Sequence, residues 1–272
     1  MSRMLPLSVA LISLVLYGTA AVQLIRAFRR GRQQRNSAAL ALGAAAVIGH
    51  AYGVQDVLFV AAGLDLSFAH TLSLAACVMG LLLVLLSLTQ PVENLGMGLF
   101  PLAGLALIGQ VALGSSGPEA VLSGANAGLD IHVLVSLIAH AVLGLAALQA
   151  IVFGIQYRLL HDHQPTGAVR TLPPLRVMET LLVRMIAIGF ALLTLALASG
   201  FVYLEDLFAQ HLVHKTVLTM AAWAVFAVLL GGHWWAGWRG PTAVRFTLGA
   251  FALLVLGYFG SKLVLELILE RP

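Results

Sequence analysis

The chain has 272 residues, of which 60% are hydrophobic and only 10% are charged. Soluble domains carry about 25% charged residues, so this composition excludes a soluble protein and predicts an integral membrane protein. The net charge of +4 does not indicate a nucleic-acid partner, because the basic residues lie in short loops where the positive-inside rule accounts for them. A single cysteine, Cys77, excludes an internal disulfide and a thiolate metal cluster.

Eight apolar segments follow one another along the chain, each of a length that crosses a bilayer as a helix. The first, at 5–25, is followed by the basic stretch RAFRRGRQQR, which is the reverse of the order in a signal peptide. The others are predicted at 37–62, 66–88, 95–113, 130–157, 178–204, 214–235 and 246–269. The sequence therefore predicts an all-α fold, a polytopic transmembrane helical bundle that forms a single integral membrane domain over residues 1–272.

The loop charges predict the orientation of this bundle. With the loop at 26–36 inside, ten Lys and Arg residues fall on the inner side and four on the outer side. The inner ones are Arg26, Arg29, Arg30, Arg32, Arg35, Arg158, Arg170, Arg176, Arg239 and Arg245, and the outer ones are Arg3, Lys215, Lys262 and Arg271. Because cytoplasmic loops carry the excess of positive charge, we expect both termini outside, in a multi-pass protein of the bacterial inner (cytoplasmic) membrane.

Nine histidines are the most informative feature of the sequence. An ionisable side chain at membrane depth is costly and is a functional candidate, and imidazole ligates metals and haem iron. His132, two residues after Asp130, is either an interfacial residue in a helix that Asp130 caps or an axial ligand. His140 shares its helix face but lies about 12 Å further along the axis, so the two imidazoles cannot bind one iron. His140 is either a ligand or a hydrogen-bonding partner of a neighbouring helix.

Four further histidines form two pairs, and the sequence leaves two interpretations open for each pair. His211 and His214 precede or begin the seventh span, either as a solvated pair or as ligands of a transition metal or of haem. His50 and His70 lie in the second and third spans. With Asp56 they form a second buried site, or they make hydrogen bonds between helices.

Three charged residues, Arg184, Lys262 and Glu266, fall inside apolar segments, and we expect them to be buried. They are compatible with a transport path, although Lys262 and Glu266 are four residues apart and can pair on one helix. The remaining histidines, His161, His163 and His233, are expected to have solvated or interfacial positions.

Several segments resemble the cytochrome c assembly family. The segment HVLVSLIAHAVLGLAALQAIVFGIQYRLL, from His132, resembles the family helix that opens with a His and continues with a Ser/Tyr/Ala-rich run. The segments HKTVLTMAAWAVFAVLL, GWRG and YFG follow the last two spans of that family in order. The segment PVENLG resembles the small eight-span branch that includes the HemX-type proteins.

The resemblance implies haem handling at the outer face of the bundle. His132 falls where the family places its first external haem-ligand histidine, and Lys215 and Thr216 fall where its Trp-rich loop ends. Two features depart from the family pattern. The segment EDLFAQHLVHK contains no Trp, and the chain ends ELILERP, without the second external histidine. His214 is the candidate replacement for that histidine.

We therefore expect a haem-binding inner-membrane protein that assists c-type cytochrome biogenesis, as an auxiliary factor rather than a self-contained enzyme. In this interpretation His132 and His214 bind the iron of haem b, and His140 is a further cofactor-binding candidate. The expected partners are membrane lipid, haem, and an apocytochrome c or other cytochrome assembly proteins. The alternatives are a membrane regulator of haem synthesis without chemistry of its own, and a small-solute or metal transporter.

Overall fold

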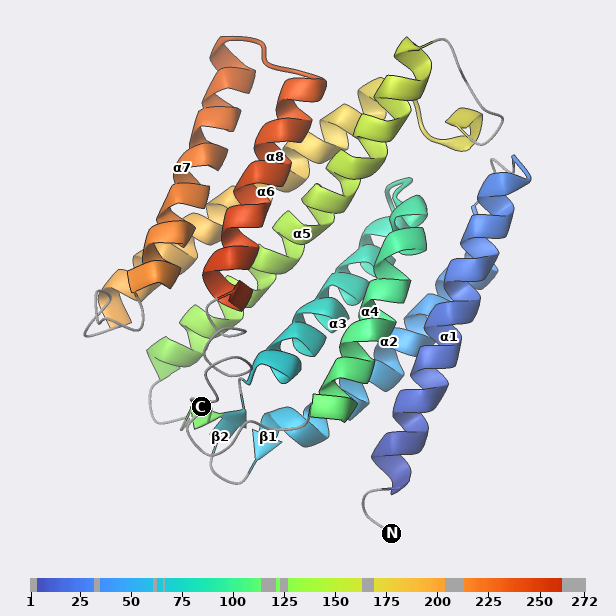
Figure 1. The fold of residues 1–272 in the computed structure, drawn as a ribbon, viewed down its shortest axis with the longest axis vertical. Helices are drawn as coiled ribbons and strands as arrows, with labels where there is room; N and C mark the ends of the chain where they lie inside the picture. The colour runs from blue at the N-terminus through green and yellow to red at the C-terminus, as the bar shows by residue number, and fades with distance from the viewer. Residues whose placement is uncertain are drawn as a thin grey trace. The chain divides into compact units, whose positions relative to one another are not determined.

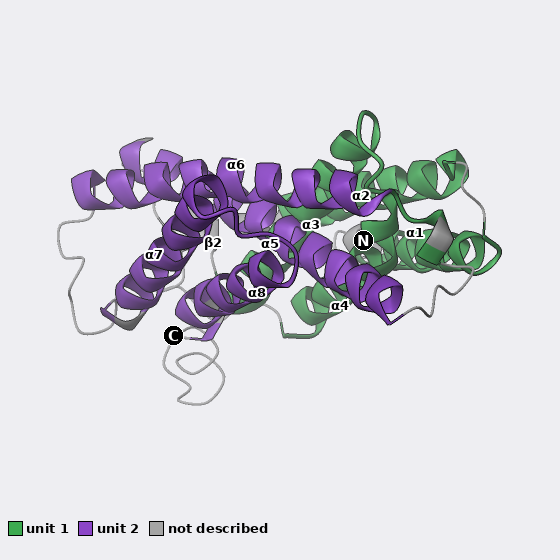
Figure 2. Ribbon diagram, turned by 90° about the horizontal axis from the view of Figure 1, so that it is seen from above, with its two compact units in different colours: residues 1–123, 164–173, 272 green, residues 124–163, 174–271 purple. Residues whose placement is uncertain are grey.

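The computed structural model describes residues 4–31, 35–60, 63–65, 67–113, 121–122, 127–162, 169–203 and 213–260. The chain divides into two compact units (Figure 2). Unit 1 comprises residues 1–123 and 164–173, and unit 2 comprises residues 124–163 and 174–271. Each unit contains four long helices (Figure 1). The single domain expected over 1–272 stays a prediction.

Unit 1 is a helical bundle with a small sheet at one end. Its helices are α1 (Met4–Arg29), α2 (Ser37–Leu58), α3 (Phe68–Ser87) and α4 (Gly96–Leu113), with a 3-10 turn at Glu93–Leu95. Helix α1 packs along α2 and α4, and α3 packs along α4 and α2. Three strands, β1 (Phe59–Val60), β2 (Gly63–Asp65) and β3 (Val121–Leu122), pair antiparallel in the order β1-β2-β3. Leu64 of β2 lies opposite Phe59 and Leu122.

Unit 2 contains α5 (Ala127–His161), α6 (Leu175–Tyr203), α7 (Val213–Trp235) and α8 (Pro241–Val255), and α8 continues into a π-helical turn at Leu256–Gly260. Helix α5 packs along α6 and α8, and α7 packs along α8 and α6. The turn between α7 and α8 uses Gly240 at φ 56, a left-handed conformation that glycine adopts without strain. The backbone N–H of Gly240 donates a hydrogen bond to Glu179 Oε1 of α6 at 2.7 Å. This bond fixes the start of α8 to α6.

The helices confirm the all-α transmembrane fold class. Eight helices in the described part of the chain are long and apolar enough to cross a membrane. The second ends at Leu58, earlier than predicted, because the chain turns into β1. The eighth begins at Pro241, earlier than predicted, since proline suits the first position of a helix. The predicted end of that span, after Gly260, lies outside the described residues. The orientation of the termini stays a prediction.

Close packing in unit 1 depends on Gly43 of α2. A methyl group at Gly43 would fall where the ring of Phe100 lies, and Phe100 is fully buried. Overpacking of a core costs about 1–3 kcal/mol. We therefore expect Gly43→Ala to lower the free energy of unfolding by about that amount, measured by denaturant titration in detergent. Gly18→Ala is the matched control in α1, because an added carbon there meets no atom within 4 Å. Equal stability of the two variants would contradict the prediction.

Candidate functional site

The first histidine of interest, His132, is held by α6. It is half-buried in the second turn of α5, and its Nδ1 lies 2.9 Å from Ser199 Oγ. Ser199 Oγ in turn lies 2.9 Å from the carbonyl oxygen of Ala196. A hydroxyl has one hydrogen and a carbonyl only accepts, so Ser199 donates to Ala196, and His132 Nδ1–H donates to Ser199. The lone pair of the imidazole is therefore on Nε2.

The second histidine, His140, is fixed by its own helix. Its Nδ1 lies 2.7 Å from the carbonyl oxygen of Ser136, and so Nδ1–H is the donor. Its Nε2 is buried and has no hydrogen-bonding partner within the described ranges of the chain. Buried polar atoms are nearly always satisfied. The Nε2 atom of His140 is therefore the strongest candidate ligand atom in unit 2.

The two histidines share an arrangement that metal-binding histidines use. Such a histidine donates its second ring N–H to a carbonyl or another acceptor, which fixes the tautomer and the ring orientation. Ser199 does this for His132, and Ser136 does it for His140. They are eight positions apart, which corresponds to about 12 Å of helix, so the structure offers two separate imidazole ligands.

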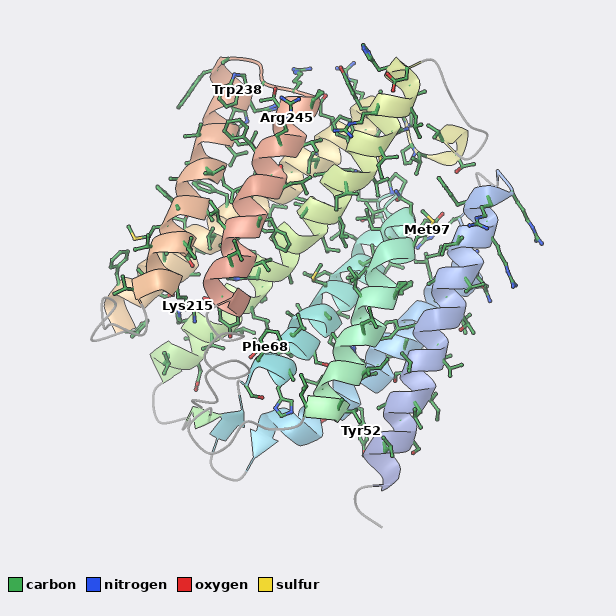
Figure 3. All side chains as sticks on the ribbon, in the orientation of Figure 1. Tyr52, Phe68, Met97, Lys215, Trp238 and Arg245 are labelled. Carbon is green, nitrogen blue, oxygen red and sulfur yellow. The ribbon has the colours of Figure 1, made fainter. Side chains whose placement is uncertain are left out.

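A lysine and a tyrosine complete this region. Lys215 Nζ, from the first turn of α7, lies 4.3 Å from the centroid of the Tyr258 ring. That ring lies 5.7 Å from the His140 ring, between centroids. Figure 3 shows Lys215 at the end of unit 2 where α7 begins, whereas Trp238 and Arg245 lie at the opposite end. We call His132, His140, Ser199, Lys215 and Tyr258 the unit 2 polar cluster.

The π-helical turn brings Tyr258 close to α7. A Cβ atom at Gly257 would lie 3.0 Å from Leu218 Cβ and 3.5 Å from the carbonyl oxygen of Lys215, so a glycine is what allows this approach. π-Helical turns are rare and occur often at functional sites. Sequence reasoning singled out Lys215 only for its charge and for the resemblance, and gave Tyr258 no role, because no sequence pattern predicts the π turn.

Several predicted site residues lie outside the described part of the structure. The backbone of His214 belongs to α7, but its side chain is not among the described residues, and neither is any part of His211. The predicted pair of His132 and His214 therefore stays a prediction. Lys262 and Glu266 also lie outside the described residues.

His50 makes hydrogen bonds between helices in unit 1. His50, Tyr17 and Ser73 each have 0% exposure. The hydroxyl of Tyr17 lies 3.2 Å from His50 Nδ1, and His50 Nε2 lies 2.8 Å from Ser73 Oγ. Both ring nitrogens thus have protein partners, as the hydrogen-bonding interpretation of the sequence expects.

His70 is buried in the first turn of α3, and the side chain of Asp56 lies outside the described residues. Within the described residues, no three His, Cys, Asp or Glu side chains group as a metal site.

The expectation that Arg184 is buried was wrong. Arg184 is exposed on α6, whereas Leu181, Leu182 and Met185 on the same helix are buried. Hydropathy shows that a segment is apolar, but not which of its faces packs inward. A transport path that relies on Arg184 therefore loses its support.

The opposite end of unit 2 has the character of a membrane interface. His233 Nδ1 lies 2.8 Å from the carbonyl oxygen of Trp238, and Trp234 and Trp235 are exposed. Aromatic residues collect at membrane interfaces. His161, at the end of α5, is exposed and stacks on Tyr157. These contacts agree with the interfacial positions expected for both histidines, and His163 lies outside the described residues.

Within the described ranges, eight helices that are long and apolar enough to cross a membrane, together with buried polar side chains, define a multi-pass helical membrane protein. The model of the cytochrome C assembly protein family matches residues 41–269, and the chain belongs to this family. It is 35% identical over 179 residues to the inner membrane protein YpjD of Escherichia coli K12, covering 65% of this chain and 67% of the relative. It is 34% identical over 209 residues to an uncharacterized 28.8 kDa protein of Azospirillum brasilense, covering 75% of this chain and 76% of the relative. No solved structure matches.

Proposed function

We propose that this protein binds haem in unit 2 and assists the assembly of c-type cytochromes in a bacterial inner membrane. Membership of the cytochrome C assembly protein family supports the role in cytochrome assembly. The Escherichia coli relative is named an inner membrane protein, which supports the location. The partners in this proposal are membrane lipid, haem, and an apocytochrome or other assembly proteins.

The observation that carries the proposal is the buried Nε2 atom of His140. It is a neutral imidazole nitrogen with its lone pair available, and it has no hydrogen-bonding partner among the described residues. Haem supplies an iron whose axial positions imidazole nitrogens fill, so the residues present fit the group. Ser136 sets the tautomer of His140, and Nε2 of that ring is buried.

His132 is the second candidate ligand, with His214 as its proposed partner at the same end of unit 2. Ser199 orients the ring of His132 and leaves its Nε2 for a ligand. The side chains of His132 and His140 are both half-buried, but Nε2 of His140 is itself a buried atom. We therefore place the stable iron site at His140, and we assign His132 to the more accessible position, through which haem would be passed on.

The proposal is tested by the absorbance spectrum of the protein, purified in detergent and titrated with haemin. We expect a Soret band shifted from that of haemin in the same detergent, saturating at one haem for each chain, in both oxidised and dithionite-reduced samples. A titration that is indistinguishable from detergent alone in both redox states would contradict haem binding.

One sequence feature favours a second function, a membrane regulator of haem synthesis. The segment at 205–215, EDLFAQHLVHK, has no Trp, although it falls where the resemblance places a Trp-rich loop that presents haem. Deletion of the gene distinguishes the two functions. Loss of cytochrome c with unchanged amounts of haem-synthesis enzymes supports the assembly role, and the reverse result supports the regulator.

A further inference from the structure

An exposed arginine lies within a membrane-spanning helix of unit 2. Helix α6, over Leu175–Tyr203, is long and apolar enough to cross a membrane, and the side chain of Arg184 is exposed on it. Within the described ranges, the guanidinium group makes no hydrogen bond or ion pair with another residue. A charge at membrane depth is costly unless it is paired. The described structure therefore leaves room for an anion beside Arg184.

The contact between α6 and the α7–α8 turn gives the depth of Arg184. Glu179 Oε1 accepts a hydrogen bond from the N–H of Gly240 in that turn, beside which the exposed Trp234 and Trp235 mark a membrane interface. Arg184 is five residues further along α6, about 7.5 Å of helix. Side chains on a helix lean towards its N-terminus, which in α6 is the end at the turn (Figure 1). Because long cationic side chains extend from such depths to the interface, the guanidinium group is placed to reach the headgroup region.

An apolar stripe continues from Arg184 towards the other end of α6. Ile188, Leu195 and Val202 follow at spacings of four and seven residues, which place them on the same side of the helix. All three side chains are exposed. This side of α6 thus presents a cation near the headgroups of one leaflet and an apolar surface that extends from it into the hydrocarbon.

A phospholipid matches both parts of this surface. A guanidinium group binds a phosphate through two parallel hydrogen bonds, and an acyl chain suits the exposed apolar side chains. We infer that Arg184 binds the phosphate of a phospholipid from the leaflet on the side of the α7–α8 turn, with an acyl chain lying along Ile188 and Leu195. This inference does not depend on haem binding.

Further arginines at the same end of unit 2 favour a lipid with a net negative charge. The exposed ones are Arg158, Arg176, Arg239 and Arg245, and Figure 3 shows Arg245 at this end. Each cation near a membrane surface contributes roughly 1 kcal/mol of attraction to anionic lipids. A carboxylate of a partner protein is the competing occupant. A phosphate is favoured over it, because lipid phosphates already lie at this level of the bilayer.

The test is native mass spectrometry of the detergent-purified full chain, titrated with phosphatidylglycerol or phosphatidylcholine. Both lipids contain a phosphate, but the choline group of the second neutralises its charge. For the parent we expect the first phosphatidylglycerol to bind about tenfold more tightly than the first phosphatidylcholine, the effect of one charge-assisted hydrogen bond. Arg184→Gln should weaken the binding of phosphatidylglycerol by about tenfold and remove most of this preference.

Two further variants and a competitor separate recognition from general effects of charge. Arg245→Gln is the matched control, because it removes an exposed cation from the same end of unit 2, and it should retain most of the preference. Arg184→Lys keeps the charge but loses the planar fork, so it should weaken phosphatidylglycerol by about threefold. Inorganic phosphate has no acyl chain and should not displace the lipid. Circular dichroism establishes that each variant is folded.

Four results would overturn the inference. The first is a folded Arg184→Gln variant that keeps the full preference for phosphatidylglycerol, and the second is an equal loss in Arg245→Gln, which would make the effect one of general charge. Displacement of the lipid by inorganic phosphate would indicate a site for a free anion. A parent that shows no lipid preference, but forms a dimer that Arg184→Gln dissociates, would identify this side of α6 as a protein interface.

Discussion

Replacing His140 by alanine is expected to abolish the absorbance band of bound haem, whereas His132→Ala should leave the position of that band unchanged. The reason is geometric. The two histidines are separated by about 12 Å along α5, so that only one of them can bind a given iron. His140 presents a buried Nε2 without a partner in the described structure, and its removal leaves no described imidazole at that depth of unit 2.

The measurement is a haemin titration of each variant, followed by spectra of the oxidised and reduced forms. His161→Ala is the control, because His161 lies on the same helix but is exposed, and it should behave as the parent does. Circular dichroism establishes that each variant is folded. If His132→Ala loses the band and His140→Ala keeps it, the iron site is at His132, and His214 becomes the expected second ligand.

Replacing His50 by alanine is expected to have the largest effect on stability, a loss of about 2–4 kcal/mol in the free energy of unfolding. The change opens a cavity in a core without exposed surface. It also leaves the Tyr17 hydroxyl and Ser73 Oγ without the bonds that they make to the ring. Each hydrogen bond between membrane helices contributes roughly 0.6–2 kcal/mol, and the cavity adds to their loss.

Denaturant unfolding in detergent measures this loss. Tyr17→Phe and Ser73→Ala each remove one of the two bonds, so each should cost less than His50→Ala. Haem binding by His50→Ala should equal that of the parent, because both nitrogens of His50 are bound by protein groups. A folded His50→Ala variant that loses haem would show instead that unit 1 contributes to the haem site.

The long helices could be predicted because membrane crossing imposes a length and a composition on each segment. Each of the eight predicted spans corresponds to a helix in the described part of the chain. Several boundaries differ by up to four residues, as where α1 ends at Arg29 and α5 at His161, and two others have a local cause. Pro241 starts α8 earlier than its hydropathy indicates, and β1 ends α2. The three short strands could not be predicted, because pairs of two or three residues leave no periodic pattern in a sequence.

The site could be predicted only as far as one helix determines it. The spacing of His132 and His140 places both on the same side of α5, since residues eight apart are separated by about 2.2 turns. Their partners come from elsewhere, Ser199 from α6 and Tyr258 from the π turn. These contacts depend on how each helix is rotated about its axis. The prediction that Arg184 is buried was wrong for the same reason, because the rotation of a helix about its axis decides which of its faces is buried.

The bond between Glu179 and Gly240 has a mechanical consequence. It anchors the turn that joins α7 to α8, and Lys215 of the polar cluster lies at the opposite end of that hairpin (Figure 3). The hairpin of α7 and α8 is therefore fixed to α6 at its turn, and its other end lies farthest from this anchor. For a helix of 23 residues, a rotation of about 3° at the joint displaces the far tip by about 2 Å. A small angular change then alters the distance between Lys215 Nζ and the Tyr258 ring, with no need to unfold either helix.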